Sequence, residues 1–195
     1  MREAEIKNYA KLNELAEQGG IIIFGSGTDK DIPTGEIRQA FDVESKIYNR
    51  SFENLSVTEA VSIYEKVIAP LAPEAVLLHI GEADLPMFAE NPTKFDNKYL
   101  ELIRLIKAKN KKCRIAVVSL KNYDNDTQIA ALNKHLKFIT DSEQCEYSDI
   151  ASKKVWNPKS TMDAVAFVYS TGFVRPLKNK HPLHDLVKML FCFEL

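Results

Sequence analysis

The chain has 195 residues, of which 45% are hydrophobic and 27% charged, as is typical of one ordinary globular domain. Its formal net charge of −1 offers no basic excess to neutralise phosphates, so we expect no nucleic-acid partner. No apolar run is long enough to span a membrane, and the first twenty residues are charged and helical, unlike a signal peptide. We therefore expect a single domain over residues 1–195, in the cytoplasm and without membrane association.

The cysteines give no sign of a metal site or of a disulfide framework. Cys113, Cys145 and Cys192 are odd in number and widely spaced. The small-residue turn at residues 25–27 is not a phosphate-loop motif. We accordingly expect no cofactor and no metal, and the sequence does not indicate an oligomeric state.

Strand-like and helix-like apolar patterns alternate along the chain. The clearest strand is the apolar run at residues 21–24, which enters the small-residue turn. The clearest helix start is the capping box Ser-Val-Thr-Glu at residues 56–59. In chain order, we expect a helix over residues 3–18, a strand over 21–25, a short helix within 29–41, a strand over 46–49, a helix over 56–69, a strand over 75–80, a loop containing Pro86 and Pro92, a helix over 94–109, a strand over 114–120, a helix over 126–141, a strand over 145–150, a strand or buried loop over 162–169 and a last helix from His181.

This alternation favours a parallel sheet that helices cover on both faces. The predicted fold class is therefore α/β: a three-layer α/β/α domain with a flavodoxin-like parallel sheet of about five strands. Open sheets of this kind place their sites at the carboxyl ends of the strands. The turn that follows the strand at residues 21–25 is the first place to look for one.

The order of several short motifs resembles the SGNH, or GDSL-type, hydrolase family, in particular the short esterases similar to platelet-activating-factor acetylhydrolase. The stretch GGIIIFG at residues 19–25 is similar to the family's "GG-[IV]-V-F-x-G-D-S" motif. The stretch YNRS at residues 48–51 is similar to its second block, "N-R-G", and AVLLHIGEADL at residues 75–85 to its third, "V-x-x-x-x-G-x-N-D-L". The resemblance spans nearly the whole chain and weakens after about residue 150.

The resemblance implies an ester-cleaving ancestor. In the family, a serine attacks the acyl carbon and an Asp-x-x-His pair near the C-terminus activates it, because a serine hydroxyl is a weak nucleophile without a base. The serine's own amide, the second-block glycine and the third-block asparagine bind the oxyanion, and such a donor lowers the barrier by roughly 3 kcal/mol in comparable sites.

Several of these groups are replaced in this chain. Gly27 stands at the position of the nucleophile and Ser26 at that of the preceding aspartate. Ser51 replaces the second-block glycine, and Ala83 replaces the third-block asparagine. No histidine has an aspartate three residues before it. We therefore predict a homologue that keeps the scaffold but is catalytically impaired, a binding pseudoenzyme.

The pocket of such a homologue would bind a small-molecule acyl ester or a carbohydrate-like ligand. Basic residues near it, Arg50, Arg175, Lys178 and Lys180, could favour an anion, although a solvated surface is the plainer interpretation. The residues expected to line the pocket are Gly25, Gly27, Asn49, Ser51, Gly81, Ala83 and Asp84.

Two alternatives stay open. In the first, the chain is an active but rewired serine esterase, with Ser26 as nucleophile, His181 or His184 as base, and Asp185 or Glu82 orienting the base. His79 lies within an expected buried strand and is interpreted as a core histidine. In the second alternative, carboxylates at the strand ends hold magnesium. Those carboxylates are Asp29, Asp31, Glu82 and Asp84.

Overall fold

A parallel β-sheet forms the centre of the molecule in the computed structural model, which describes residues 2–40, 43–122 and 126–151. All pairings in this sheet are parallel, and the strand order is β2-β1-β3-β4-β5. The predicted α/β class with a parallel sheet of about five strands is confirmed. The strands are β1 (Ile21–Gly25), β2 (Ile47–Asn49), β3 (Ala75–His79), β4 (Arg114–Val118) and β5 (Glu146–Ser148).

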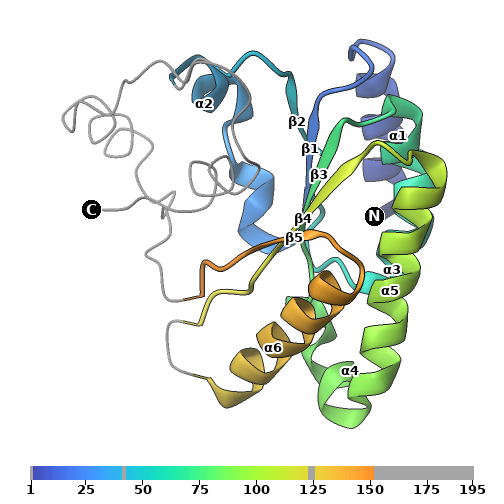
Figure 1. Ribbon diagram of the computed structural model, residues 1–195. Helices are drawn as coiled ribbons and strands as arrows, with labels where there is room; N and C mark the ends of the chain where they lie inside the picture. Colours follow the sequence, from blue (N-terminus) through green and yellow to red (C-terminus); the bar gives the residue numbers. More distant parts are fainter. Residues whose placement is uncertain (1, 41–42, 123–125, 152–195) are drawn as a thin grey trace.

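Helices flank the sheet, and most of those that the structure describes lie on one side of it. Helices α1, α3, α4, α5 and α6 lie on that side, and α2 lies on the other (Figure 1). Their bounds are α1 (Arg2–Asn13), α2 (Thr34–Ala40), α3 (Val57–Ile63), α4 (Leu85–Glu90), α5 (Pro92–Lys109) and α6 (Thr127–Ser142), and the short 3-10 turns at the strand ends are η1 (Gly27–Asp31) and η4 (Glu82–Asp84).

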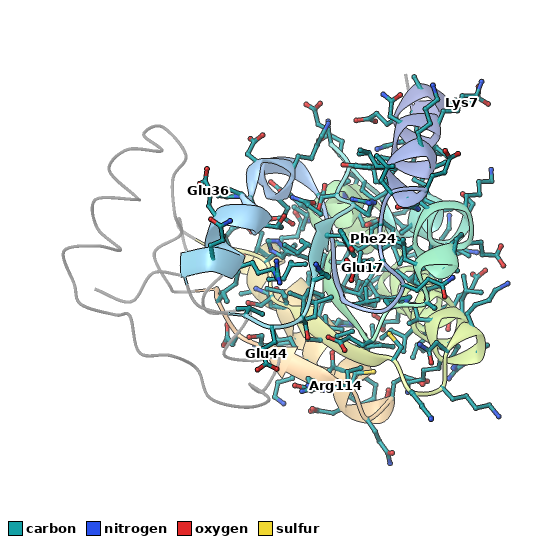
Figure 2. The ribbon with its side chains drawn as sticks, turned by 90° about the horizontal axis from the view of Figure 1, so that it is seen from above. Lys7, Glu17, Phe24, Glu36, Glu44 and Arg114 are labelled. Carbon is teal, nitrogen blue, oxygen red and sulfur yellow. The ribbon has the colours of Figure 1, made fainter. Side chains whose placement is uncertain are left out.

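The core is divided into two layers because successive strand residues point to opposite faces of the sheet. Ile22 and Phe24 of β1 pack in the larger layer, under α3, α5 and α6. Ile21 and Ile23 pack in the smaller layer, which includes Ile37 of α2. Figure 2 shows Phe24 inside the molecule, with charged side chains around the periphery. Burial on both faces is the reason that the strands are continuous apolar runs.

The helix boundaries follow local chemistry. The capping box at residues 56–59 is confirmed: the Ser56 hydroxyl accepts the Glu59 amide, and α3 begins at Val57. The helical path then continues through a π turn, η2 (Tyr64–Ile68), and a 3-10 turn, η3 (Ala69–Leu71). The path ends after Leu71, where Ala72 adopts a left-handed conformation with a φ of +46°, close to the predicted end.

One predicted loop is wrong. The stretch containing Pro86 and Pro92 is η4, α4 and the first turn of α5. Each proline occupies the first turn of a helix, where its missing N–H has no partner to lose. The first helix is also shorter than predicted and ends at Asn13. The elements predicted at residues 162–169 and from His181 lie outside the described residues.

Cys113 is buried, and Cys192 lies outside the described residues. Among the helices that the structure describes, none is both long and apolar enough to cross a membrane.

Candidate functional site

The candidate site lies at the carboxyl ends of β1 and β3. The chain leaves β1 for β2 on one side and later returns to add β3 on the other, so the strand order reverses between these two strands. Ligands of open α/β sheets bind outside the carboxyl ends of the strands at such a reversal. The turns η1 and η4 follow β1 and β3 directly and meet at this edge.

Asp29 folds back onto the end of β1. Its Oδ2 atom accepts a hydrogen bond from the Ser26 amide at 3.2 Å, and its side chain is only 5% exposed. A Cβ atom built on Gly25 would lie 1.9 Å from the same Oδ2 atom. Residue 25 must therefore be glycine for the Asp29 carboxylate to occupy this place.

Asp29 also holds a histidine. Nδ1 of His79, the last residue of β3, lies 2.8 Å from Asp29 Oδ2, and the His79 side chain is 15% exposed. Burial disfavours the charged ring, but the attraction of the Asp29 carboxylate and the hydrogen bond to it outweigh burial and raise the pKa of His79 above its ordinary value of 6.5. His79 is thus part of an aspartate–histidine pair at the edge of the sheet.

Sequence reasoning missed this pair. The two residues are 50 positions apart, and although His79 lies within the third-block stretch, no motif links it to Asp29. The signal that was present is topological: Gly25 is in register with His79 in the sheet, so a residue of the turn after Gly25 can reach the His79 ring. Adjacent pairing of β1 and β3 could have suggested the contact, but the apolar patterns do not specify which strands are neighbours.

The second-block residues Asn49 and Ser51 support the same turn from β2. The Ser51 hydroxyl is fully buried and accepts the Gly25 amide at 3.1 Å. The Asn49 side chain accepts the Ser51 amide at 3.0 Å and donates to the Asp29 carbonyl at 2.6 Å. The polar groups of both residues are engaged with the backbone around the turn.

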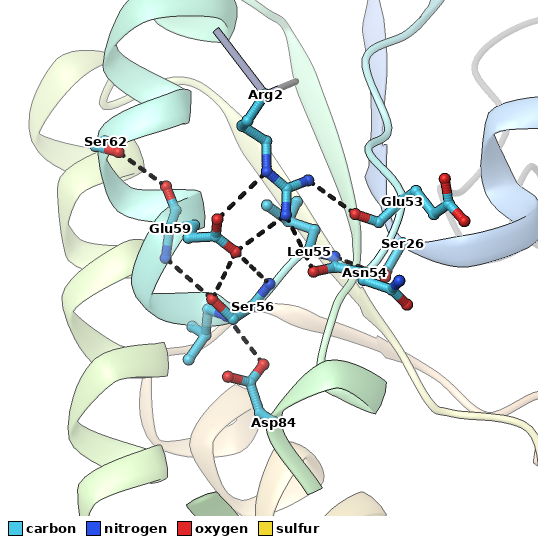
Figure 3. A network of polar contacts seen from close by, with 10 residues as sticks. Arg2, Ser26, Glu53, Asn54, Leu55, Ser56, Glu59, Ser62 and Asp84 are labelled. Atoms are coloured by element: carbon cyan, nitrogen blue, oxygen red, sulfur yellow. Dashed lines mark hydrogen bonds and ion pairs between the residues drawn. The ribbon is translucent and has the colours of Figure 1, made fainter. Parts of the chain in front are cut away.

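Ser26 and Asp84 hold the loop before α3 (Figure 3). The Ser26 hydroxyl accepts the Leu55 amide at 3.0 Å, and Asp84 Oδ2 accepts the Val57 amide at 2.9 Å. Both residues are buried, Ser26 at 9% and Asp84 at 2% exposed. Burial raises the pKa of Asp84 to about 6, although the hydrogen bond from Val57 opposes this. The two side chains thus accept the backbone amides of residues 55 and 57, at the junction between this loop and α3.

Arg2 secures the same loop from its outer side. Its guanidinium donates to the carbonyls of Glu53 and Asn54, at 2.8 and 3.2 Å, and pairs with the Glu59 carboxylate (Figure 3). The loop between β2 and α3 is therefore held both by the site turns and by the N-terminal helix.

The more accessible part of the site is small. Gly27 is half-buried and has a left-handed φ of +57°. Among the atoms of the described residues, a Cβ atom built on it would meet only Glu82 Oε2, at 3.8 Å. Glu82 is exposed and Ala83 half-buried, whereas Gly81 is buried.

Other sequence-predicted residues lie elsewhere or beyond the described residues. Arg50 is buried, and its guanidinium packs over the rings of Tyr9, in α1, and Tyr48, in β2. His181 and His184, the proposed bases, and Asp185 lie outside the described residues, as do Arg175, Lys178 and Lys180.

The magnesium alternative finds no support in the described part of the chain, where no group of three or more histidine, cysteine, aspartate or glutamate side chains is arranged to hold a metal ion. Asp29 is engaged by His79 and the Ser26 amide. Asp84 is engaged by the Val57 amide. These two carboxylates therefore serve internal contacts.

Comparison with known proteins gives a likeness of structure only. No family model and no curated protein matches the sequence. A GDSL-like lipase from Bacteroides thetaiotaomicron superposes with a TM-score of 0.60 at 16% identity, covering 85% of this chain and 91% of the lipase. The acetyl xylan esterase AlAXEase superposes with a TM-score of 0.59 at 11% identity, covering 87% of this chain and 96% of the esterase. The predicted resemblance to GDSL-type hydrolases is thus confirmed at the level of the fold.

Proposed function

We propose that this chain is a single-domain, small-molecule-binding protein with the fold of GDSL-type hydrolases but without their serine-esterase activity. The observation that carries this proposal is the engagement of the Ser26 hydroxyl. It is buried and accepts the Leu55 amide, and the next residue, at the position of the family's nucleophile, is glycine. The serine of this turn supports the fold, and the nucleophile position carries no hydroxyl.

The oxyanion donors are replaced as well. Ser51 stands where the family has a glycine, which can donate only its backbone amide, and the Ser51 amide is engaged by the Asn49 side chain at 3.0 Å. Ala83 has a methyl group where the family has an amide. Since one such donor lowers the barrier by roughly 3 kcal/mol, these losses alone would slow an acyl-transfer step by orders of magnitude.

The accessible groups suggest the class of ligand. The exposed Glu82 carboxylate can accept hydrogen bonds from hydroxyl groups, and the half-buried Gly27 and Ala83 beside it carry no polar side chain, which suits an acyl methyl. An acylated carbohydrate offers both groups. A structural neighbour named as an acetyl xylan esterase agrees with this class. We therefore propose an acyl-ester or carbohydrate-like ligand.

The test is an NMR titration of the ¹⁵N-labelled protein with acetylated xylobiose, with xylobiose and acetate as separate probes. We expect saturable shifts of the Gly27, Glu82 and Ala83 amides with the acetylated sugar, weakened in Glu82→Gln. The matched control is Glu101→Gln on the outer face of α5, which should bind as the wild type does. Chemical-shift changes that do not saturate, or that occur mainly at other amides, would contradict binding of this class of ligand at this site.

The second candidate is a rewired serine esterase that uses Ser26 with His181 or His184. The names of the structural neighbours favour it, since they include a GDSL-like lipase and an acetyl xylan esterase. This candidate requires the Ser26 hydroxyl to leave the Leu55 amide and to meet an imidazole at roughly 3 Å. It predicts hydrolysis of p-nitrophenyl acetate that is lost in Ser26→Ala and in either His181→Ala or His184→Ala.

A further inference from the structure

One carboxylate oxygen joins the two halves of the candidate site. Asp29 Oδ2 lies 3.2 Å from the Ser26 amide nitrogen, at the start of the turn after β1, and 2.8 Å from His79 Nδ1, at the end of β3. The Asp29 carbonyl is held in addition by the Asn49 side chain. The Asp29–His79 contact therefore ties the turn at residues 26–31 to the end of β3, while the ion pair between Lys30 and Glu5, at 2.8 Å, ties it to α1.

The charge on the His79 ring is set by groups from three elements. In the described part of the chain, these groups are Asp29 of η1 and Glu82 of η4, which favour the imidazolium, and Lys121, after β4, which opposes it. The two carboxylates outweigh the lysine and the cost of burial, so the pKa of His79 lies above 6.5. His79 consequently loses its proton at a higher pH than an ordinary histidine does.

We propose that Asp29 and His79 form a proton-operated latch, which holds the turn at residues 26–31 closed against β3 while the ring is charged and loosens it when the ring is neutral. The inference rests on the proposed function in one respect, since this turn carries Gly27 of the ligand site. Opening of the latch would then change access to that site without any change in the rest of the fold.

The physical reason is the loss of charge assistance. A neutral ring can still donate a hydrogen bond from Nδ1 to the carboxylate, but the Coulomb attraction between the imidazolium and the buried carboxylate is lost. With a neutral ring, the buried Asp29 carboxylate no longer faces the positive charge of His79 at 2.8 Å, which favours its return to water. The Ser26 amide then loses its acceptor, and this amide is a local reporter of the latch.

Hydrogen exchange of single backbone amides tests the latch without any ligand. Exchange rates from pH 6.5 to pH 9 are converted to protection factors, which removes the intrinsic effect of pH. We expect the protection of Ser26 to fall several-fold as His79 loses its proton, while that of Val76, in the middle of β3, changes little. In His79→Gln and in Asp29→Asn, the protection of Ser26 should be low and independent of pH.

The chain offers a matched control. Nδ1 of His135 lies 2.9 Å from Asp96 in a second aspartate–histidine pair on the surface of α5 and α6, far from the turn in sequence. His135→Gln should leave the pH dependence of Ser26 protection intact. Protection of Ser26 that does not change with pH in the wild type, or that falls in parallel with Val76, would overturn the latch. Because no ligand is present, that failure is distinguishable from failure of the binding proposal.

Discussion

Gly25 shows how a single residue determines the arrangement of this site. Its missing side chain is the space that the Asp29 carboxylate fills, and that carboxylate holds both the turn and His79. In the sequence, Gly25 belongs to a small-residue turn and is expected to line the pocket. The structure gives the reason for a glycine at this position, which is close packing by a side chain four residues later.

We predict that Gly25→Ala destabilises the protein by about 1–3 kcal/mol, because the new methyl group forces the Asp29 carboxylate out of its buried place. Urea unfolding measures this loss, and NMR titration of His79 should show its pKa moving down as the carboxylate leaves. The matched control is Gly35→Ala, in α2, where a Cβ atom meets no atom of the described residues within 4 Å. That variant should be neutral or more stable by about 0.5–1 kcal/mol. Equal losses in the two variants would contradict the packing explanation.

At the scale of elements, α3 depends on a carboxylate from another part of the chain. Its own capping box satisfies the Glu59 amide, but the Val57 amide, in the first turn, is satisfied by Asp84 from η4. This contact ties the start of α3 to the end of the β3 segment. It also buries a carboxylate whose pKa is raised to about 6.

This raised pKa predicts a stability profile with a definite sign. The folded protein binds the Asp84 proton more tightly than the unfolded chain, whose pKa is near 3.8. The free energy of unfolding should therefore fall as pH rises from about 4 to about 6, by up to roughly 3 kcal/mol, and this contribution should be constant above pH 6. Chemical unfolding at a series of pH values measures the slope.

Asp84→Asn should flatten that slope, since the amide cannot ionise but its oxygen still accepts the Val57 amide. Asp141→Asn is the control, because Asp141 is exposed and pairs with Lys137 one turn away. If Asp84→Asn kept the wild-type slope while Asp141→Asn removed it, the assignment to Asp84 would be wrong.

At the scale of the whole molecule, the sequence predicted the architecture well because the architecture depends on short-range patterns. The apolar run of β1 and the capping box of α3 each contain their own start and stop signals, and both were found where expected. The helices at Pro86 and Pro92 were missed because a proline is equally typical of a loop and of a first helical turn.

The candidate site was less predictable, since its main contacts join distant parts of the chain. Asp29 and His79 meet only after β3 has been placed beside β1. The engagement of Ser26 by the Leu55 amide likewise depends on the path of the loop before α3. Motif comparison identified which groups were replaced, but it could not show what the remaining polar side chains do instead.

The central claim is that this molecule has the fold of a serine esterase without an activated serine. Labelling with a fluorophosphonate probe, read by intact mass and peptide mapping, tests it most directly. We predict no adduct on the wild type under conditions that fully label an active GDSL-like lipase, and none on Gly27→Ser, which restores a hydroxyl at the nucleophile position but not its base. A stoichiometric adduct on Ser26 of the wild type, absent from Ser26→Ala, would contradict the account and establish the rewired esterase.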